Sequence, residues 1–314
     1  MDVLTTVDRE RIQALRARDE FFWLDLAAPA AADLDAAGEL LGLHELALED
    51  TREFSQRPKL DRYPGTVLLV FWSACVTPDG LTTQLVEIHL HISGGFLFTA
   101  RPRGCSELDA LHDALDPEEA HAEDYIVYRV LDVLTDAVFP VVDHLEARID
   151  ALEEAVLSDT DRRQLSEIYR LKQEVQAVLR RLVPQRDQFG AASDAILGLP
   201  GLTRGSPEYL RDIGDHLAQV TGELYRQTDD LGALTSTYFN ANANRLNRLA
   251  ARLTILATFF LIWTLVTSFF GQNFGWLVDH IESFEAFVIY ETIGLVIPTV
   301  LAAVYFWRRR REWL

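Results

Sequence analysis

Near the C-terminal end of this 314-residue chain, small, amide and hydroxyl side chains recur along one face of a largely apolar, helix-forming segment. Leucines interrupt this polar stripe, which comprises Asn247, Ala250, Leu253 or Thr254, Ala257, Leu261, Thr264, Ser268 and Gly271. In lipid, polar side chains gather at helix contacts or line water, because hydrocarbon leaves their hydrogen-bonding groups unpaired. The stripe therefore indicates either helix packing, since Ser and Thr can bond their own backbone, or a water-filled path.

Two apolar segments near the C-terminus are long enough to carry such a path across a membrane. Residues 253–270 contain no charge, and residues 287–307 contain one, Glu291. A bilayer core of about 30 Å needs about 20 helical residues. We expect two transmembrane helices, at 253–270 and 287–307, with residues 271–286 between them as an outer loop.

Charge is distributed unevenly along the chain and predicts its orientation. The net charge of −19 divides into −21 for residues 1–240 and +2 for the remainder. The loop 271–286 has no Lys or Arg, whereas arginines flank both spans at their other ends: Arg245, Arg248, Arg252, Arg308, Arg309, Arg310 and Arg311. The positive-inside rule then places both termini in the cytoplasm of a multi-pass protein of the cell (plasma or inner) membrane, because the N-terminus lacks an apolar signal core.

The part before the membrane reads as α+β followed by helices. Residues 1–115 alternate helical signals with strand-like runs at 21–26, 66–76, 85–92 and 96–100, which predicts a cytoplasmic α/β domain. Apolar residues at spacings of three and four predict antiparallel helices over 116–205. Ser206 and Pro207 are typical of a helix start, and no proline follows before Phe270. We therefore expect a stalk helix over 206–252 that continues into the first span, and a basic tail at 308–314.

Several function classes are disfavoured by composition. The acidic balance repels phosphate backbones, so nucleic-acid binding is not expected. The chain has two cysteines without framework spacing, and it lacks the phosphate-loop, nucleophile-elbow and HExxH motifs. His89 and His91 share a strand face, but without a third ligand at suitable spacing we expect a structural role. We expect neither an enzyme nor an organic cofactor.

The outer end of the first span carries Gly271, Gln272 and Asn273. These residues and the stripe resemble the CorA family of divalent cation channels. The resemblance extends to five further segments: FFWLDL at 21–26, HELALEDTREFSQRPKLDRYPGTVLLVFW at 44–72, EYLRDIGDHL at 208–217, NRLNRLAARLTILATFF at 244–260 and the ending RRRREWL. The family signature is Gly-Met-Asn. The chain departs from it at Gln272, and the ZntB branch, which transports zinc, also varies at this position.

The resemblance implies a homopentameric funnel in which the first spans enclose the pore. It assigns Gly271, Gln272 and Asn273 to the selectivity filter, where amide and carbonyl oxygens suit a hydrated Mg2+ ion. The implied pore-lining residues are Asn247, Ala250, Leu253, Ala257, Leu261, Thr264 and Ser268, with Leu253 and Leu261 at hydrophobic gates. Asp212 falls on the regulatory aspartate of the family, Asp79 is a candidate partner, and the basic residues Arg308 to Arg311 contact lipid or surround the inner pore mouth.

Three functions follow as hypotheses. The first is passive Mg2+ influx through a pentamer gated by cytoplasmic Mg2+, so that Mg2+ is both transported and regulatory. The second is ZntB-like transport of Zn2+, Co2+ or Ni2+, with or without proton coupling. The third is a non-conducting membrane-tethered sensor or scaffold. The expected partners are further copies of the chain, the lipid bilayer and divalent cations.

Overall fold

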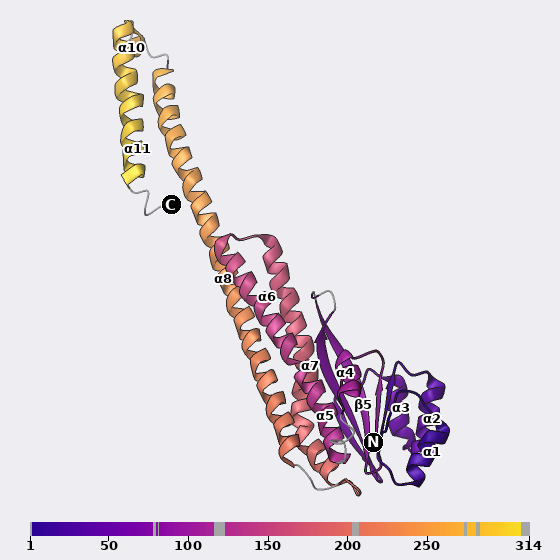
Figure 1. The fold of residues 1–314 in the computed structure, drawn as a ribbon. Helices are drawn as coiled ribbons and strands as arrows, with labels where there is room; N and C mark the ends of the chain where they lie inside the picture. The colour runs from indigo at the N-terminus through magenta and orange to yellow at the C-terminus, as the bar shows by residue number, and fades with distance from the viewer. Residues whose placement is uncertain are drawn as a thin grey trace. The chain divides into compact units, whose positions relative to one another are not determined.

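The computed structural model describes residues 2–77, 80, 82–115, 123–202, 207–272, 275–280 and 283–308. The chain divides into two compact units. The first comprises residues 1–155 and 161–235, and the second comprises residues 156–160 and 236–314. The long helix α8 (Pro207–Phe270) contributes residues to both units (Figure 1).

A six-stranded mixed sheet forms the centre of the first unit. Its strands are β1 (Asp2–Leu4), β2 (Phe22–Ala27), β3 (Lys59–Tyr63), β4 (Thr66–Val76), β5 (Thr83–Ser93) and β6 (Phe96–Arg101). The order is β1-β2-β6-β5-β4-β3; β1, β2 and β6 run parallel, and the remaining neighbours are antiparallel. The four strands predicted from the sequence are confirmed as β2, β4, β5 and β6.

Helices cover both faces of this sheet. One face packs against α1 (Arg9–Ala17), α2 (Ala31–Leu41) and α3 (Glu45–Glu53), and the other against α4 (Ser106–Ala114), α5 (Glu123–Asp136), α7 (Arg162–Leu197) and α8 (Figure 1). Side chains alternate along the strands: Phe22 and Leu24 face the first group of helices, whereas Trp23, Phe71 and Ile88 face the second. Burial of these apolar side chains, at roughly 25 cal/mol per Å2, stabilises the three layers.

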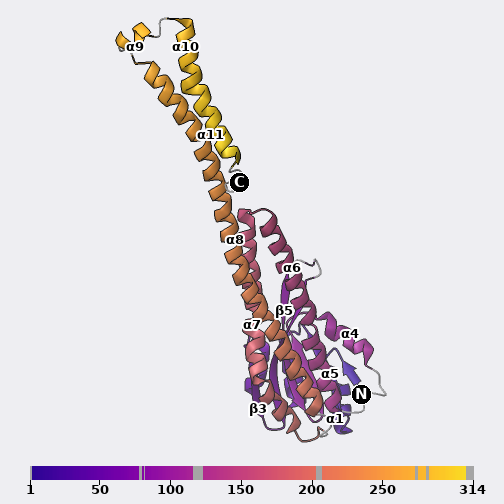
Figure 2. The ribbon, with the colours of Figure 1, turned by 90° about the vertical axis from the view of Figure 1, so that its left-hand side faces the viewer.

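The apolar series predicted over residues 131–156 is divided between two helices. Helix α5 ends at Asp136, and α6 (Phe139–Ser158) begins three residues later. Pro140 lies in the first turn of α6, where its missing N–H leaves no intrahelical hydrogen bond unmade. Helix α7, which is labelled in Figure 2, follows after Asp161, whose carboxylate caps its N-terminus.

The long helix and the second apolar helix are both confirmed. Helix α8 begins at Pro207 and ends at Phe270. After α9 (Gly275–His280), helix α10 (Phe284–Glu291), the π-turn η1 (Thr292–Val296) and α11 (Ile297–Arg308) continue one another. Each of the two long helical stretches contains an 18-residue window of mean hydropathy 2.0 of which 0% is buried within the chain. Both are long and apolar enough to cross a membrane.

Candidate functional site

The second unit presents the polar stripe of α8 on an uncovered face. Its members Asn247, Ala250, Leu253, Ala257, Leu261, Thr264 and Ser268 are all exposed. The half-buried positions on the same stretch are Ala251, Ile255, Thr258, Phe259, Ile262 and Val266. At about 100° per residue, the centres of these two faces lie roughly 140° apart around the helix. The stripe therefore points away from the face that packs within the unit.

Helix α11 lies on the half-buried side of α8. The rings of Phe259 and Phe306 have centroids 6.2 Å apart, and the indole nitrogen of Trp263 donates a hydrogen bond of 3.0 Å to the Thr299 hydroxyl. Packing between α8 and α11 thus does not involve the polar stripe. Of the helix packing considered from the sequence, packing against α11 of the same chain does not account for the stripe.

The hydroxyls on α8 donate their protons to their own helix. Thr254 donates to the carbonyl oxygen of Ala250 at 2.9 Å, and Thr264 to that of Phe260 at 2.7 Å. A hydroxyl used in this way keeps its oxygen lone pairs available as acceptors. Thr264, in the stripe, therefore offers an oxygen that can accept from water or approach a hydrated cation.

The predicted filter begins where α8 ends. Gly271 donates its N–H to the carbonyl oxygen of Thr267 at 2.9 Å, and Gln272 donates to that of Phe269 at 3.3 Å. A Cβ at position 271 would lie 3.0 Å from the Thr267 oxygen, so a glycine suits this close turn. Gln272 is exposed. Asn273 lies outside the described residues, so its role stays a prediction.

A cluster of potential metal ligands surrounds the predicted regulatory residue Asp212 in the first unit. Ligand atoms of Asp132 on α5 and of Asp212 and His216 on α8 all lie within 4.8 Å of one another. His216 Nδ1 lies 3.3 Å from Asp136 Oδ1, and His216 Nε2 lies 3.8 Å from Asp212 Oδ1. The imidazole is thus close to both carboxylates, although its Nδ1 makes no hydrogen bond of regular geometry.

The charges of this cluster are incompletely balanced. Three carboxylates, those of Asp132, Asp136 and Asp212, face one guanidinium, that of Arg129, which donates to Asp132 at 2.7 Å. Burial raises the pKa of the Asp132 carboxyl, and the negative charge of Asp136 raises it further against the effect of Arg129. The pKa of the neighbouring Tyr128 rises to about 12 through burial and the charges of Asp132 and Asp212. Oxygen donors with excess negative charge fit a divalent cation.

Sequence reasoning named Asp212 as a candidate ligand but did not name Asp132, Asp136 or His216. The spacing of four residues within each pair, 132 with 136 and 212 with 216, is visible in the sequence and places each pair on one helix face. The packing of α5 against α8 that brings the pairs together is not visible there. The other predicted ligand, Asp79, lies outside the described residues.

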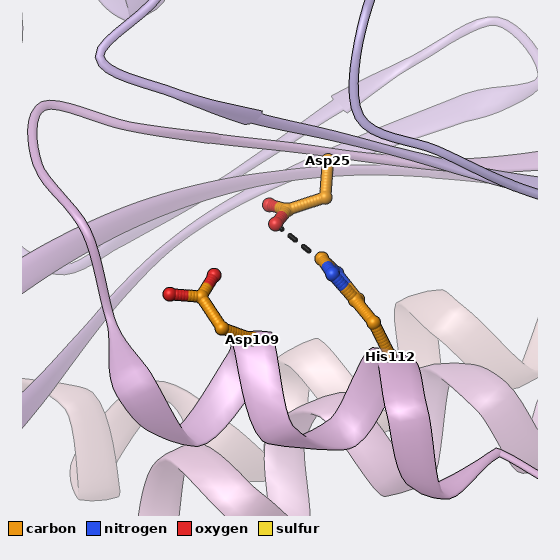
Figure 3. Close-up of side chains that lie close together, drawn as sticks. All are labelled: Asp25, Asp109 and His112. Carbon is orange, nitrogen blue, oxygen red and sulfur yellow. Dashed lines mark ion pairs between the residues drawn. The ribbon is translucent and has the colours of Figure 1, made fainter.

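A second group of the same residue types, Asp25, Asp109 and His112, lies at the sheet and α4 (Figure 3). Arg101 fills the space between its carboxylates: Nη2 donates to Asp25 Oδ2 at 2.7 Å and to Asp109 Oδ1 at 2.6 Å. Burial raises the pKa of Asp25, but His112 and Arg101 lower it by more, so that the net shift is downward. A metal ion would have to displace a guanidinium that is 2% exposed. This group therefore does not fit a metal.

His89 and His91 belong to a buried polar network. Thr51 Oγ1 lies 2.9 Å from His91 Nε2 and 3.2 Å from His89 Nδ1, and Glu87 Oε1 lies 2.8 Å from His89 Nε2. Glu87 also accepts hydrogen bonds from the backbone N–H groups of Ser55 and Gln56. Burial, with the neighbouring His89, lowers the pKa of His91 to about 3. These contacts support the structural role expected for both histidines.

The basic C-terminal residues are described only in part. Arg308 is the last residue of α11 and is exposed. Arg309, Arg310 and Arg311 lie outside the described residues, so the predicted contact of this group with lipid or with the pore mouth stays a prediction. Arg245 of α8, by contrast, donates to the carbonyl oxygen of Thr160 in the same unit at 2.6 Å.

Comparisons with known proteins agree with this architecture. A family model described as CorA-like Mg2+ transporter protein matches residues 18–311. The chain is 22% identical over 314 residues to the cobalt/magnesium transport protein CorA of Thermotoga maritima, which covers 98% of this chain and 88% of that protein. It is 22% identical over 261 residues to the zinc transport protein ZntB of Yersinia enterocolitica, which covers 83% of this chain and 78% of that protein.

The fold is also similar to that of a solved structure. The CorA magnesium transporter from Methanocaldococcus jannaschii superposes with a TM-score of 0.78 at 18% sequence identity, and the match covers 93% of this chain and 91% of that one. At this identity the likeness concerns the fold. The mixed α/β N-terminal domain, the long helix and the second C-terminal apolar helix are thus features of a known architecture.

Proposed function

This chain belongs to the CorA-like Mg2+ transporter family, and from that premise we propose that it forms a passive channel for Mg2+ entry, built from five copies in the cell membrane with both termini in the cytoplasm. Members of the family transport divalent metal cations. The observation that carries the proposal is the polar stripe of α8, which is exposed along its whole length and faces away from α11. One helix cannot enclose a pore, so several copies must each contribute this face.

In the proposed pore, Gly271, Gln272 and Asn273 form the outer selectivity filter. Neutral oxygens suit an ion that sheds its water reluctantly and prefers octahedral oxygen coordination. Below the filter, Thr264 and Ser268 offer hydroxyls, and rings of Leu261 and Leu253 act as gates that close by excluding water. These leucines are 70% and 67% exposed within one chain.

Transport in this proposal needs no chemical energy source. The membrane potential contributes about 2.3 kcal/mol per unit charge per 100 mV, and therefore about 4.6 kcal/mol for a divalent ion. The Arg residues beside each span, among them Arg248, Arg252 and Arg308, hold the inner ends of the helices at the cytoplasmic surface.

We infer a regulatory role for the cluster of Asp132, Asp212 and His216. At high cytoplasmic Mg2+ the ion would neutralise the excess negative charge and stabilise the conformation in which α5 and α8 approach each other. Loss of the ion would leave the carboxylates repelling one another, which shifts the population toward other conformations. Asp212→Ala should therefore allow flux at millimolar internal Mg2+; normal inhibition of that variant would exclude Asp212 from regulation.

A second candidate function is transport of Zn2+ or another transition ion, with or without proton coupling. Two observations favour it: Gln272 replaces the methionine of the family signature, and an imidazole, which suits transition ions better than Mg2+, belongs to the cytoplasmic cluster. A non-conducting sensor would have no need for the stripe.

The test is uptake by liposomes that contain the purified protein, with Mg2+, Co2+, Ni2+ and Zn2+ compared in the presence and absence of a proton gradient. The Mg2+ channel predicts Mg2+ uptake that is independent of the proton gradient and is abolished by Asn273→Ala with assembly intact. Preference for Zn2+ would support the second candidate, and absence of all uptake would support a sensor. Unchanged flux in the Asn273→Ala variant would overturn the filter assignment.

A further inference from the structure

A tryptophan in the middle of the first span connects α8 to α11. The Trp263 indole N–H donates to the Thr299 hydroxyl at 3.0 Å. Trp263 is the eleventh residue of the apolar segment 253–270, and Thr299 is the thirteenth residue of the segment 287–307. Both are therefore near the middle of the bilayer, whereas tryptophan normally prefers the membrane interfaces. Trp276 and Trp307, by comparison, lie outside or at the end of these segments.

The position of Trp263 demands a specific partner. An indole N–H left unpaired in hydrocarbon costs free energy, because neither lipid nor water accepts its hydrogen bond there. Thr299 supplies the acceptor, and its own proton goes to the carbonyl oxygen of Leu295 at 2.6 Å. The three groups thus form a chain from the Trp263 N–H through the Thr299 hydroxyl to the Leu295 carbonyl.

This chain ends at an irregular part of the outer helix. Leu295 belongs to the π-turn η1, in which the Ile297 N–H bonds to the carbonyl oxygen of Thr292, five residues back. Pro298 follows and has no N–H to offer to Gly294. The backbone preceding Thr299 is therefore wider than an α-helix, and π-turns of this kind are frequent at functional sites. The hydrogen bond from Trp263 therefore connects α8 to the first regular helical turn after η1.

The hydrogen bond between Trp263 and Thr299 determines which face of α8 is left uncovered by α11. Trp263 and Phe259 contact α11, and the centre of the polar stripe lies more than a third of a turn away from Trp263 on the other side of the helix. Because successive residues differ by about 100° around the helix, a rotation of α8 by about 50° would bring Leu265 to the centre of the stripe in place of Thr264, or, in the opposite direction, Phe260 in place of Leu261. A contact that fixes the rotation of α8 therefore fixes the lining of the stripe.

We propose that Trp263 and Thr299 are positioning residues for ion selection: their hydrogen bond holds α8 at the rotation that presents the polar stripe. The inference rests on the proposed function, because it requires the stripe to line the ion path. The residues themselves touch no ion. Their effect appears in the relative passage of ions of different size and hydration, such as Mg2+ and Co2+.

The variants Trp263→Phe and Thr299→Val remove the donor and the acceptor and keep similar volumes. Matched controls are Trp307→Phe and Thr292→Val; Thr292 donates within its own helix, to the Val288 carbonyl oxygen at 2.7 Å. Thr299→Ser restores the hydroxyl. Uptake of Mg2+ and of Co2+ is measured for each full-length variant in liposomes, and the ratio of the two rates is compared. A merely less stable protein loses both fluxes by the same factor, which leaves the ratio unchanged.

We expect Trp263→Phe and Thr299→Val each to change the Co2+ to Mg2+ ratio by about threefold, as for a single interhelical hydrogen bond in a membrane. The double variant should change it no further, because both substitutions remove the same bond. Thr299→Ser and the controls should match the wild type. If the wild type conducts and Thr299→Val has the same ratio as Thr292→Val, the positioning role is overturned and the channel stands. If the wild type moves no ion, the proposed function falls, and this inference falls with it.

Discussion

The substitution Asp132→Asn separates a cation site from an ordinary surface of acidic residues. The Asp132 side chain is 9% exposed and lies beside the carboxylates of Asp136 and Asp212, the imidazole of His216 and the guanidinium of Arg129. Because its folded pKa is raised by burial and by Asp136, its contribution to stability is fully present below its unfolded pKa and is lost as pH rises through the folded value. At neutral pH without metal, the charged carboxylate therefore opposes folding, and asparagine should leave the protein as stable as the wild type or more stable.

If Mg2+ binds at this cluster, the order of stability of the wild type and Asp132→Asn is reversed. A ligand that binds only the folded state stabilises it by RT ln(1 + [L]/Kd), about 2.7 kcal/mol at 100 times Kd. For a unit of 150–250 residues, 1 kcal/mol shifts Tm by about 2–4 °C, so the wild type should gain about 5–11 °C. The asparagine variant loses a charged ligand and most of this gain. The less stable protein in EDTA thus becomes the more stable one in Mg2+.

The assay is thermal unfolding of the full-length protein in detergent, followed by circular dichroism, in EDTA and in increasing Mg2+. Asp35→Asn is the matched control, because Asp35 pairs with Arg52 on the surface at 56% and 40% exposure, where an ion pair contributes at most about 1 kcal/mol. Equal Mg2+-induced shifts in the wild type and in Asp132→Asn would refute the reasoning. So would a loss of stability in the variant that is the same in EDTA and in Mg2+.

Three other predictions concern Leu261, Gln272 and the two cysteines. Leu261→Ser should increase Mg2+ leak through the closed channel, about tenfold for each 1.4 kcal/mol removed from the barrier. Leu256→Ser, on the same helix but outside the stripe, should not increase it. Equal leak in the two variants, measured in liposomes, would contradict the gate. Gln272→Met should raise the ratio of Mg2+ to Zn2+ uptake, and an unchanged ratio would show that position 272 does not select the ion. Burial raises the pKa of the Cys105 thiol to about 12, so Cys105 should resist maleimide in the native protein and react after denaturation. The half-buried Cys75 should react first. Mass spectrometry counts the adducts, and equal reaction rates of the two thiols would contradict the burial of Cys105.

The strands that the sequence predicts are those with long apolar runs. The eleven residues of β4 were predicted at their observed bounds because most of them are apolar, and seven of these apolar residues are buried. The missed strands β1 and β3 form the two edges of the sheet. Strand β3, with the sequence KLDRY, is largely polar and pairs on one side only, and β1 has three residues. Neither contains enough apolar residues for periodicity to reveal it.

The C-terminal region shows the same dependence on local signals. The second apolar helix was expected from residue 287, where the uninterrupted apolar run begins, but α10 starts at Phe284. Ser283 explains the difference, because its hydroxyl accepts a hydrogen bond from the Ala286 N–H at 3.1 Å and caps the helix. The hydrogen bond between Trp263 and Thr299 has no counterpart in any sequence pattern, since 36 residues separate the two.

Residue types alone do not decide which acidic group is suited to a cation. Both groups contain two aspartates and a histidine within 4.8 Å. In the group of Asp25, Asp109 and His112, Arg101 lies between the two carboxylates and pairs with both, so the fold itself supplies the positive charge that balances them. In the group of Asp132, Asp212 and His216, Arg129 pairs with Asp132, and Asp136 and Asp212 leave an excess of negative charge.

Breaking the buried pair of Asp25 and Arg101 with Asp25→Asn should cost about 3–5 kcal/mol, equally in EDTA and in Mg2+. Because the pKa of Asp25 is lowered, the stability that this pair contributes is present above the unfolded pKa of the carboxyl and is lost as pH falls through the folded one. A Mg2+-dependent effect of Asp25→Asn in the same thermal assay would contradict this distinction between the two groups.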